Sequence, residues 1–241
     1  MKVLVIPDSH LKLWVIEHGI ELADRYRVDK IVTLGDYFDD WISIDRDYYD
    51  MMDYLKVLLR REHRLIALFG NHELSYFGYP CSGHKRKLQP YIYDKLANDQ
   101  RLFPAVGLDG VLYSHAGVCL DWIRENKILT ENAIRYGLTR AAGASKLEDA
   151  ICRQEFNIFA QAGALRGGHG APSCVWADAR ELIADHIPKV SQIVGHTPVK
   201  EITFMSNCWF TDVFSNGNVC DEYLLVEDGE PKIVHYNEVT L

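Results

Sequence analysis

Residues 64–73 read Arg-Leu-Ile-Ala-Leu-Phe-Gly-Asn-His-Glu, an unbroken apolar run followed directly by polar residues. Five consecutive apolar residues at 65–69 are typical of a strand that is buried on both faces, as the strands of parallel sheets are. Gly70 ends the run, where a glycine allows the backbone to turn sharply. The stretch therefore predicts a buried strand with a polar cluster at its carboxyl end.

The same pattern occurs twice earlier in the chain. Residues 2–6 are a short β-rich run that leads to Asp-Ser-His at 8–10. Residues 30–34 are another, which leads to Gly-Asp-Tyr-Phe-Asp-Asp at 35–40. Three strands are therefore expected, each followed by polar side chains.

Apolar residues at helical spacing separate these strands, over residues 11–27 and 47–61. The order strand–helix–strand–helix–strand is typical of a parallel sheet with helices packed on it. In open α/β sheets the carboxyl ends of parallel strands converge on one edge, where ligands bind. We therefore expect polar clusters from distant parts of the sequence to meet in one cleft.

Two later strands also end in polar clusters. Residues 111–114 lead to Ser-His-Ala-Gly at 114–117, and residues 192–194 lead to Gly-His-Thr at 195–197. Further helices are predicted over residues 91–96, 130–140, 146–162 and 178–186. The cleft is thus expected to receive five polar clusters.

The tail, residues 200–237, changes to short strands. They are predicted over residues 202–205, 208–213, 223–227 and 232–236, with turn residues at 216–218 and 228–230. This pattern predicts an antiparallel meander added to the same sheet system. No linker separates a second domain, so we expect residues 1–241 to form a single domain.

Composition and charge exclude several classes of protein. The 241 residues are 48% hydrophobic and 25% charged, which is average for a globular domain and excludes a wholly disordered chain. No apolar run is long enough to span a membrane and the N-terminus lacks a secretion signal, so we expect a cytoplasmic protein. With 26 basic and 34 acidic residues the net charge is −8, which gives no signal for nucleic-acid binding.

The five clusters supply Asp, His and Asn side chains. Imidazole and carboxylate groups suit Zn, Fe and Mn, and the absence of a Cys-x-x-Cys pair argues against a structural zinc site. Each cluster alone has an ordinary explanation, such as Asp8 capping a helix or Asn71 occupying a turn. Five clusters at successive strand ends favour a site for two ions that share a bridging carboxylate.

This ordered series resembles the calcineurin-like metallophosphoesterases. The residues that carry the resemblance are Asp-x-His at 8–10, Gly-Asp-x-x-Asp at 35–39, Gly-Asn-His-Glu at 70–73, His115, and Gly-His-Thr at 195–197. Within that superfamily the chain is similar to the phosphoprotein phosphatase branch, which includes phage and bacterial enzymes and the symmetrical diadenosine tetraphosphate hydrolases. The nearer likeness rests on residues 70–73, 114–117, 173–176 and 195–198.

The resemblance implies an α/β fold in which two mixed sheets form a β-sandwich flanked by helices. It also implies two divalent metal ions, with Mn²⁺, Fe or Zn²⁺ as the expected metals. Asp8 and His10 would hold the first ion and Asp36 would bridge. The ligands of the second ion would be Asn71, His115 and His196.

The resemblance further implies hydrolysis of a phosphomonoester by a water that the two ions activate. His72 would donate a proton to the leaving oxygen, and Asp39 would orient His72. The substrate would be a phosphorylated small molecule, a nucleotide or a phosphoprotein; the sequence does not indicate the oligomeric state. A dinucleoside polyphosphate hydrolase is the alternative enzyme, and a catalytically silent scaffold is the alternative of another class.

One position departs from the nearer branch. Asp40 stands where that branch has an arginine that grips the phosphate, and we expect its carboxylate to face outward. Arg166, in a glycine-rich loop, and Arg180 are candidate replacements, although each could be an ordinary surface arginine. Trp176 leaves two interpretations open, a core residue or a stacking surface for a nucleobase.

Overall fold

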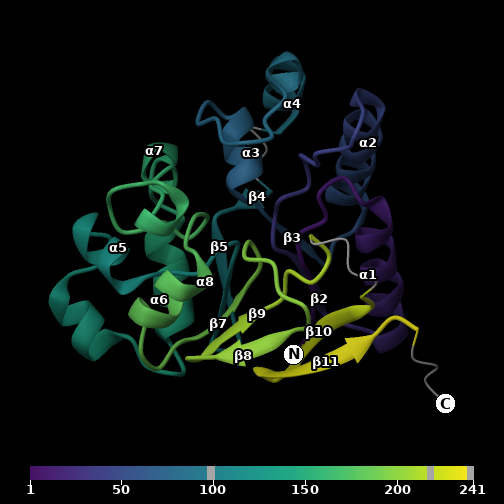
Figure 1. Cartoon of the computed structure of the whole chain (residues 1–241). Coiled ribbons are helices and arrows are strands. Elements are labelled where there is room, and N and C mark those ends of the chain that lie inside the picture. Colours follow the sequence, from purple (N-terminus) through teal and green to yellow (C-terminus); the bar gives the residue numbers. More distant parts are fainter. Residues whose placement is uncertain (97–100, 216–219, 238–241) are drawn as a thin grey trace.

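The computed structural model describes residues 1–96, 101–215 and 220–237. Two β-sheets lie face to face, and helices cover the outer side of each (Figure 1). The predicted α/β fold, with two mixed sheets flanked by helices, is confirmed. The turn predicted at 216–218 lies outside the described residues.

The first sheet has six strands in the order β11-β10-β1-β2-β3-β4. Their bounds are β1 (Lys2–Ile6), β2 (Lys30–Thr33), β3 (Leu65–Leu68), β4 (Leu102–Phe103), β10 (Glu222–Glu227) and β11 (Glu230–His235). Strands β1 to β4 are parallel, while β10 pairs antiparallel with β1 and β11 antiparallel with β10. The connecting helices α1 (Leu13–Tyr26) and α2 (Asp45–Arg61) cover this sheet (Figure 1).

The second sheet has five strands in the order β5-β6-β7-β9-β8. Their bounds are β5 (Ala105–Leu108), β6 (Val111–Ser114), β7 (Ser191–Val194), β8 (Thr203–Met205) and β9 (Cys208–Phe210). Strands β6, β7 and β9 are parallel. The helices on its outer side are α5 (Leu120–Glu125), α6 (Gly143–Ile151), α7 (Phe156–Phe159) and α8 (Ala179–Asp185).

Two shorter helices, α3 (Asn71–Tyr76) and α4 (Gln89–Leu96), lie beyond the carboxyl ends of the first sheet's strands (Figure 1). The remaining elements are single turns, namely η1 (Arg86–Leu88), η2 (Ala133–Gly137) and η3 (Ala164–Arg166).

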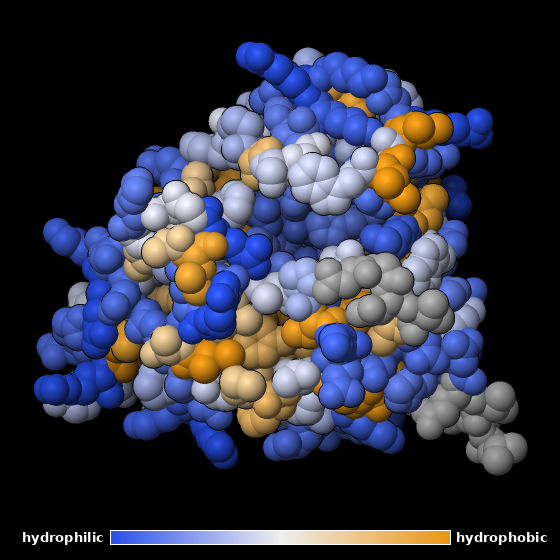
Figure 2. Space-filling model, viewed as in Figure 1, coloured by the Kyte–Doolittle hydropathy of each residue, from blue (hydrophilic) through white to orange (hydrophobic). Residues whose placement is uncertain are grey.

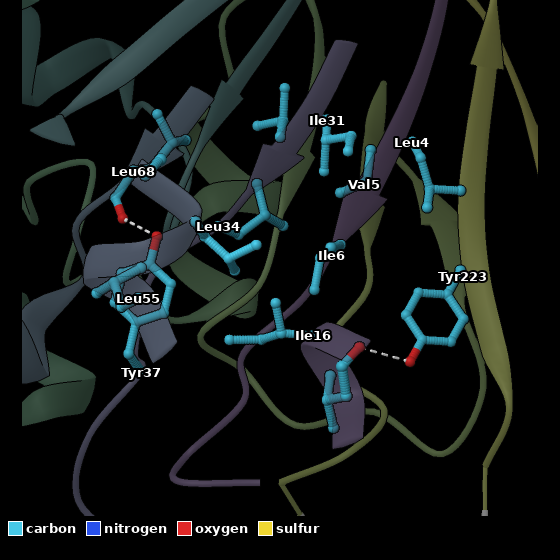
Figure 3. Packing of buried hydrophobic residues seen from close by; sticks show 14 of the residues in the cluster. Leu4, Val5, Ile6, Ile16, Ile31, Leu34, Tyr37, Leu55, Leu68 and Tyr223 are labelled. Carbon is cyan, nitrogen blue, oxygen red and sulfur yellow. Dashed lines mark hydrogen bonds between the residues drawn. The ribbon is translucent and has the colours of Figure 1, made fainter. Parts of the chain in front are cut away.

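The core of the first sheet is apolar, and buried tyrosine hydroxyls in it are hydrogen-bonded to backbone carbonyls (Figure 3) at Tyr37 and Tyr223. Leu4, Val5 and Ile6 of β1 are completely buried, as the unbroken apolar run requires. The Tyr37 hydroxyl donates to the carbonyl of Leu68, and the Tyr223 hydroxyl donates to the carbonyl of Val15, each over 2.8 Å. These bonds fix the segment after β2 and the strand β10 against their neighbours.

The prediction of a single antiparallel meander in the tail is wrong. Strand β9 joins the second sheet parallel to β7, whereas β10 crosses to the first sheet and pairs with β1. The alternation of apolar and polar residues predicts a strand but not its partner, because either sheet offers an apolar face. The tail therefore completes both sheets.

Two predicted helices are also corrected. The segment 130–140 is helical only over residues 131–137, which end in the turn η2, and 146–162 divides into α6 and α7. After α6 the residues 152–155 are mostly exposed, and the rings of Phe156 and Phe159 then pack on Phe69 at 5.6 and 5.5 Å between centroids. The apolar stripe changes direction at that point, so one continuous helix could not bury both halves.

Candidate active site

The five polar clusters meet, but they come from two sheets rather than one. Strands β1, β2 and β3 of the first sheet and β6 and β7 of the second all end at this site. Our expectation of a single sheet edge is therefore corrected. The site lies where the carboxyl ends of both parallel sets converge.

The carboxylate of Asp36 lies at the centre of the site. Its Oδ2 is 3.8 Å from Nε2 of His10, 3.3 Å from Nε2 of His115 and 4.0 Å from Nε2 of His72. Its Oδ1 accepts a hydrogen bond from the backbone N–H of His72 over 3.0 Å. One carboxylate thus faces three imidazole rings, a grouping of Asp and His side chains that could bind a metal ion.

A second group of donor atoms surrounds His115. Its Nδ1–H donates to the carbonyl of Leu34 over 2.9 Å, which leaves a lone pair on Nε2. That Nε2 lies 3.0 Å from Oδ1 of Asn71 and 3.1 Å from Nδ1 of His196. Lone pairs that converge in this way repel one another unless a proton or a metal cation lies between them.

The electrostatics of this group favour positive charge. Burial lowers the pKa of His115, but the Asp36 and Asp8 carboxylates outweigh it and raise that pKa to about 9. Burial, with His115 next to it, holds the pKa of His196 well below its usual value. A neutral His196 beside a cation-attracting position suits metal binding.

Several buried atoms at the site have no hydrogen-bond partner among the described residues. They include Oδ1 of Asp8, Nε2 of His196 and Oδ2 of Asp212. The other oxygen of Asp8 accepts from the backbone N–H of His196 over 2.9 Å. Unpaired buried polar atoms are costly, and carboxylate, amide and imidazole donors suit Mn, Fe or Zn. The residues present therefore fit a divalent metal centre.

Some of the backbone strain in the chain occurs at the candidate site residues. His10, Asp36, Asp39 and His196 have φ values of 41°, 49°, 65° and 63°. This left-handed region is uncommon for residues with a side chain and costs free energy. The surrounding structure holds four candidate residues in this conformation, which is typical of functional sites.

Two glycines allow backbone to approach the carboxylates closely. A Cβ on Gly70 would lie 2.1 Å from Oδ1 of Asp36, and a Cβ on Gly195 would lie 1.9 Å from Oδ1 of Asp8. Any side chain at either position would displace a candidate ligand. The glycines in the polar clusters therefore serve close approach as well as turning.

His72 is held between Asp39 and the cavity. Its Nδ1–H donates to Oδ2 of Asp39 over 2.8 Å, and its Nε2 faces Asp36. Burial lowers the pKa of His72, but the Asp36 charge and the hydrogen bond to Asp39 outweigh it and hold that pKa well above its usual value. The ring therefore keeps its proton and presents Nε2–H to the cavity.

Glu73 has a structural role that our sequence analysis did not predict. Its carboxylate accepts backbone N–H groups of Gly70, Asp36 and Tyr37, each over 2.8 Å. It is completely buried, and burial together with the Asp36 charge raises its pKa to about 7. Glu73 thus ties the cluster after β2 to the cluster after β3. The position of Glu73 in the Gly-Asn-His-Glu segment was the one sequence feature that could have indicated this role.

A cavity of about 390 Å³ opens over these residues, and Figure 2 shows a hydrophilic hollow at the centre of this face. The candidate residues that line it are His10, Asp36, Asp39, Asn71, His72 and His196. Asp8 and His115 lie beneath them and are almost fully buried. A second cavity of about 420 Å³, which Leu120 and Leu138 help to line, contains none of the candidates.

The two candidate arginines differ in their position relative to the cavity. Arg166 lines the cavity, where its guanidinium donates to Oγ1 of Thr197 over 3.2 Å and lies 3.4 Å from Asp178. Arg180 lies outside the cavity lining; its side chain is 72% exposed and pairs with Asp178 at 2.9 Å. Only Arg166 can therefore reach a ligand in the cavity without a rearrangement.

Three further charged residues of the cavity wall were not predicted to lie there. We expected Asp40 to face outward, and this is wrong: it lines the cavity, in a turn where its Oδ1 accepts from the N–H of Ile42 over 3.4 Å. Lys12 adds a cation to the wall and Asp212 a carboxylate. Asp212 follows β9, whose parallel pairing with β7 the sequence did not reveal.

Comparison with known proteins now identifies the family. Residues 1–200 match the sequence pattern of the calcineurin-like phosphoesterases. The chain belongs to this family. Members of the calcineurin-like phosphoesterase family are hydrolases that depend on divalent metals, and the Asp, His and Asn groups described above fit such a site.

Solved structures with the same fold include phosphatases. The cold-active protein-tyrosine phosphatase of the psychrophile Shewanella sp. is 18% identical with a TM-score of 0.58, over 98% of this chain and 78% of that one. A point mutant of a cold-active protein tyrosine phosphatase has the same identity and coverage and a TM-score of 0.60. A metallophosphoesterase from Sphaerobacter thermophilus is 14% identical with a TM-score of 0.45, over 98% and 89%.

For the two phosphatase structures, at 18% identity, the likeness concerns the fold alone. No curated protein sequence matches this chain. Within the described residues, every helix is too short or too polar to cross a bilayer.

Proposed function

We propose that this calcineurin-like phosphoesterase is a metal-dependent phosphomonoesterase. One observation supports this most strongly. The Asp36 carboxylate faces His10, His115 and His72. Asp39 accepts a hydrogen bond from the other ring nitrogen of His72. In this proposal the first two rings bind metal, and the third gives a proton. The pattern of a metal centre with an adjacent general acid is what hydrolysis of a phosphoester needs.

The metal ligands are proposed as two sets that share Asp36. Asp8 and His10 would hold one ion, and Asn71, His115 and His196 the other, with Mn²⁺, Fe or Zn²⁺ as the metals. Two such ions supply an activated water and positive charge for the phosphoryl oxygens. Two divalent ions would also offset the buried carboxylates and allow a chain of net charge −8 to bind an anion.

His72 is proposed as the general acid. Its Nδ1–H is committed to Asp39, so Nε2 is the nitrogen that delivers a proton to the leaving oxygen. Asp39 itself accepts from the hydroxyls of Tyr48 and Tyr76, which hold the carboxylate in place. Asp39 is therefore a positioning residue, because it acts through His72.

Arg166 is proposed to contact the phosphate in place of the arginine that Asp40 replaces. It lines the cavity and its charge is only partly balanced by Asp178 at 3.4 Å. Arg180 is not proposed as a phosphate contact, because its guanidinium is exposed and outside the cavity.

We further propose that residues 1–241 form one domain and that the protein acts in the cytoplasm.

A substrate panel on the metal-loaded protein tests the proposal. Aryl and alkyl phosphomonoesters should be hydrolysed, whereas a phosphodiester and diadenosine tetraphosphate should react much more slowly. Preference for the dinucleotide would favour the alternative polyphosphate hydrolase. Binding of metal without hydrolysis of any phosphoester would instead favour the silent scaffold.

A further inference from the structure

We propose that the substrate carries a planar aromatic ring on the group that leaves with the ester oxygen, and that Trp41 and Trp176 bind this ring. The inference rests on the proposed phosphomonoesterase activity and narrows its substrate. Both tryptophans line the same cavity as His72 and the candidate metal ligands. They come from different parts of the fold, one after β2 and the other before α8.

Trp41 is unusually accessible for its residue type. It is 84% exposed, and Ile42 and Ile44 beside it are 88% and 64% exposed. Figure 2 shows hydrophobic residues on this side of the hollow, near the position of α2 in Figure 1. A tryptophan normally buries most of its large apolar surface, so one left in water at a cavity mouth has that surface available for a ligand.

Trp176 is a fixed part of the wall. It is half-buried, while the preceding Cys174 and Val175 are completely buried. Its backbone N–H donates to the carbonyl of Ser173 over 3.0 Å. The ring centroid lies 6.0 Å from that of His196, with the ring planes 79° apart. Because His196 is a proposed metal ligand, Trp176 would touch the part of the substrate next to the phosphate.

The charges of the cavity restrict the rest of the leaving group. Four carboxylates line it, those of Asp36, Asp39, Asp40 and Asp212, against the two fixed cations of Lys12 and Arg166. With two metal ions bound, positive charge would be concentrated at the phosphate, while Asp40 keeps negative charge beside Trp41. A leaving group with further phosphates would meet this carboxylate. An uncharged aromatic leaving group would meet two indole rings instead.

Steady-state kinetics with matched substrates test the inference. The aromatic substrates are phenyl phosphate, a phosphotyrosine peptide and a nucleoside 5′-monophosphate; glycerol phosphate and phosphoserine lack the ring. Trp41→Ala and Trp176→Ala should each lower kcat/KM for the preferred aromatic substrate roughly 3- to 10-fold, the scale of one aromatic contact. They should leave the two alkyl substrates within about twofold. Tyr136→Ala, at a 72% exposed aromatic outside the cavity, is the matched control.

Binding of inhibitors separates ring recognition from leaving-group chemistry. Phenylphosphonate should inhibit the wild type more strongly than methylphosphonate, and both tryptophan variants should lose that difference. Trp176→Phe should retain part of it, which guards against a folding defect in Trp176→Ala. The aromatic substrate with the largest loss identifies the source of the ring, as a nucleobase, a peptide tyrosine or a simple arene.

Equal losses for aromatic and alkyl substrates, or none for either, would overturn the inference while leaving the phosphomonoesterase intact. A different result would refute the proposed function itself: the metal-loaded wild-type protein would hydrolyse no phosphomonoester. In that case the phosphonate comparison still tests the two tryptophans.

Discussion

Oδ2 of Asp39 accepts the Nδ1–H of His72 over 2.8 Å, while its Oδ1 accepts the hydroxyls of Tyr48 and Tyr76. Each oxygen of the carboxylate is therefore occupied, and the imidazole has one orientation. Nε2 of His72 is left to face the cavity. This arrangement makes His72 the side chain whose removal should separate chemistry from metal binding.

His72→Asn should keep the metal content of the wild type but lose roughly 10²- to 10⁴-fold in kcat, the usual scale for loss of a general acid. The loss should be smaller for aryl than for alkyl phosphates, because a good leaving group needs no proton. Metal analysis and kcat on both substrate types provide the measurement, with the exposed His63→Asn as control. Equal losses on the two substrates would refute the acid assignment.

The pH dependence follows from the charges around His72. Burial opposes its charged form, but Asp36 and Asp39 outweigh burial and raise its pKa, so the acid form persists to high pH. With an alkyl substrate, kcat should fall as the pH rises through that pKa. Asp39→Asn removes one cause of the shift, so its kcat should be lower and should fall at lower pH. An alkaline limb that does not move in Asp39→Asn would contradict the pairing.

Glu73→Gln should destabilise the site without touching substrate. An amide NH₂ would face at least one of the three backbone N–H groups that the carboxylate accepts, which costs about 1–3 kcal/mol. The expected fall in Tm is several degrees for a domain of this size. Thermal unfolding measures it, with the exposed Glu155→Gln as control. An unchanged Tm would show that these three bonds contribute no net stability.

Arg166→Ala should raise KM or lower kcat by roughly 10-fold or more, the effect of losing a charge-assisted hydrogen bond to phosphate. Arg180→Ala is the matched control, because both arginines pair with Asp178 but only Arg166 lines the cavity. It should behave like the wild type, and both variants should keep their metals. If Arg166→Ala is also unaffected, the metal ions alone bind the phosphate.

Much of this site could be predicted because its residues follow buried strands. Asp8, Asp36 and His115 each come directly after an apolar run, and the carboxyl ends of parallel strands converge. Their common location needed only the strand positions. Their individual roles as ligands came from the family resemblance and stay proposals.

Other parts depend on tertiary packing that short-range patterns do not encode. Asp212 was missed because the parallel pairing of β9 with β7 was not visible in a tail that looked antiparallel. Asp40 was misplaced because a turn hydrogen bond to Ile42 sets its position at the cavity wall. The predicted helix over 146–162 broke where Phe156 turns to pack on Phe69. For Asp212 and for the segment 146–162 a long-range contact outweighed local propensity, whereas the Asp40 bond is a local turn contact.

The central claim is that the side chains around Asp36 form a catalytic centre with two metal ions. Mn²⁺ should be titrated into chelated, metal-free protein while bound metal and hydrolysis of an aryl phosphomonoester are measured on the same sample. We predict no activity without metal, activity that saturates when two ions are bound per chain, and loss of both in Asp36→Asn but not in the exposed Asp50→Asn. Hydrolysis at an unchanged rate after chelation, or full metal binding by Asp36→Asn, would contradict the account.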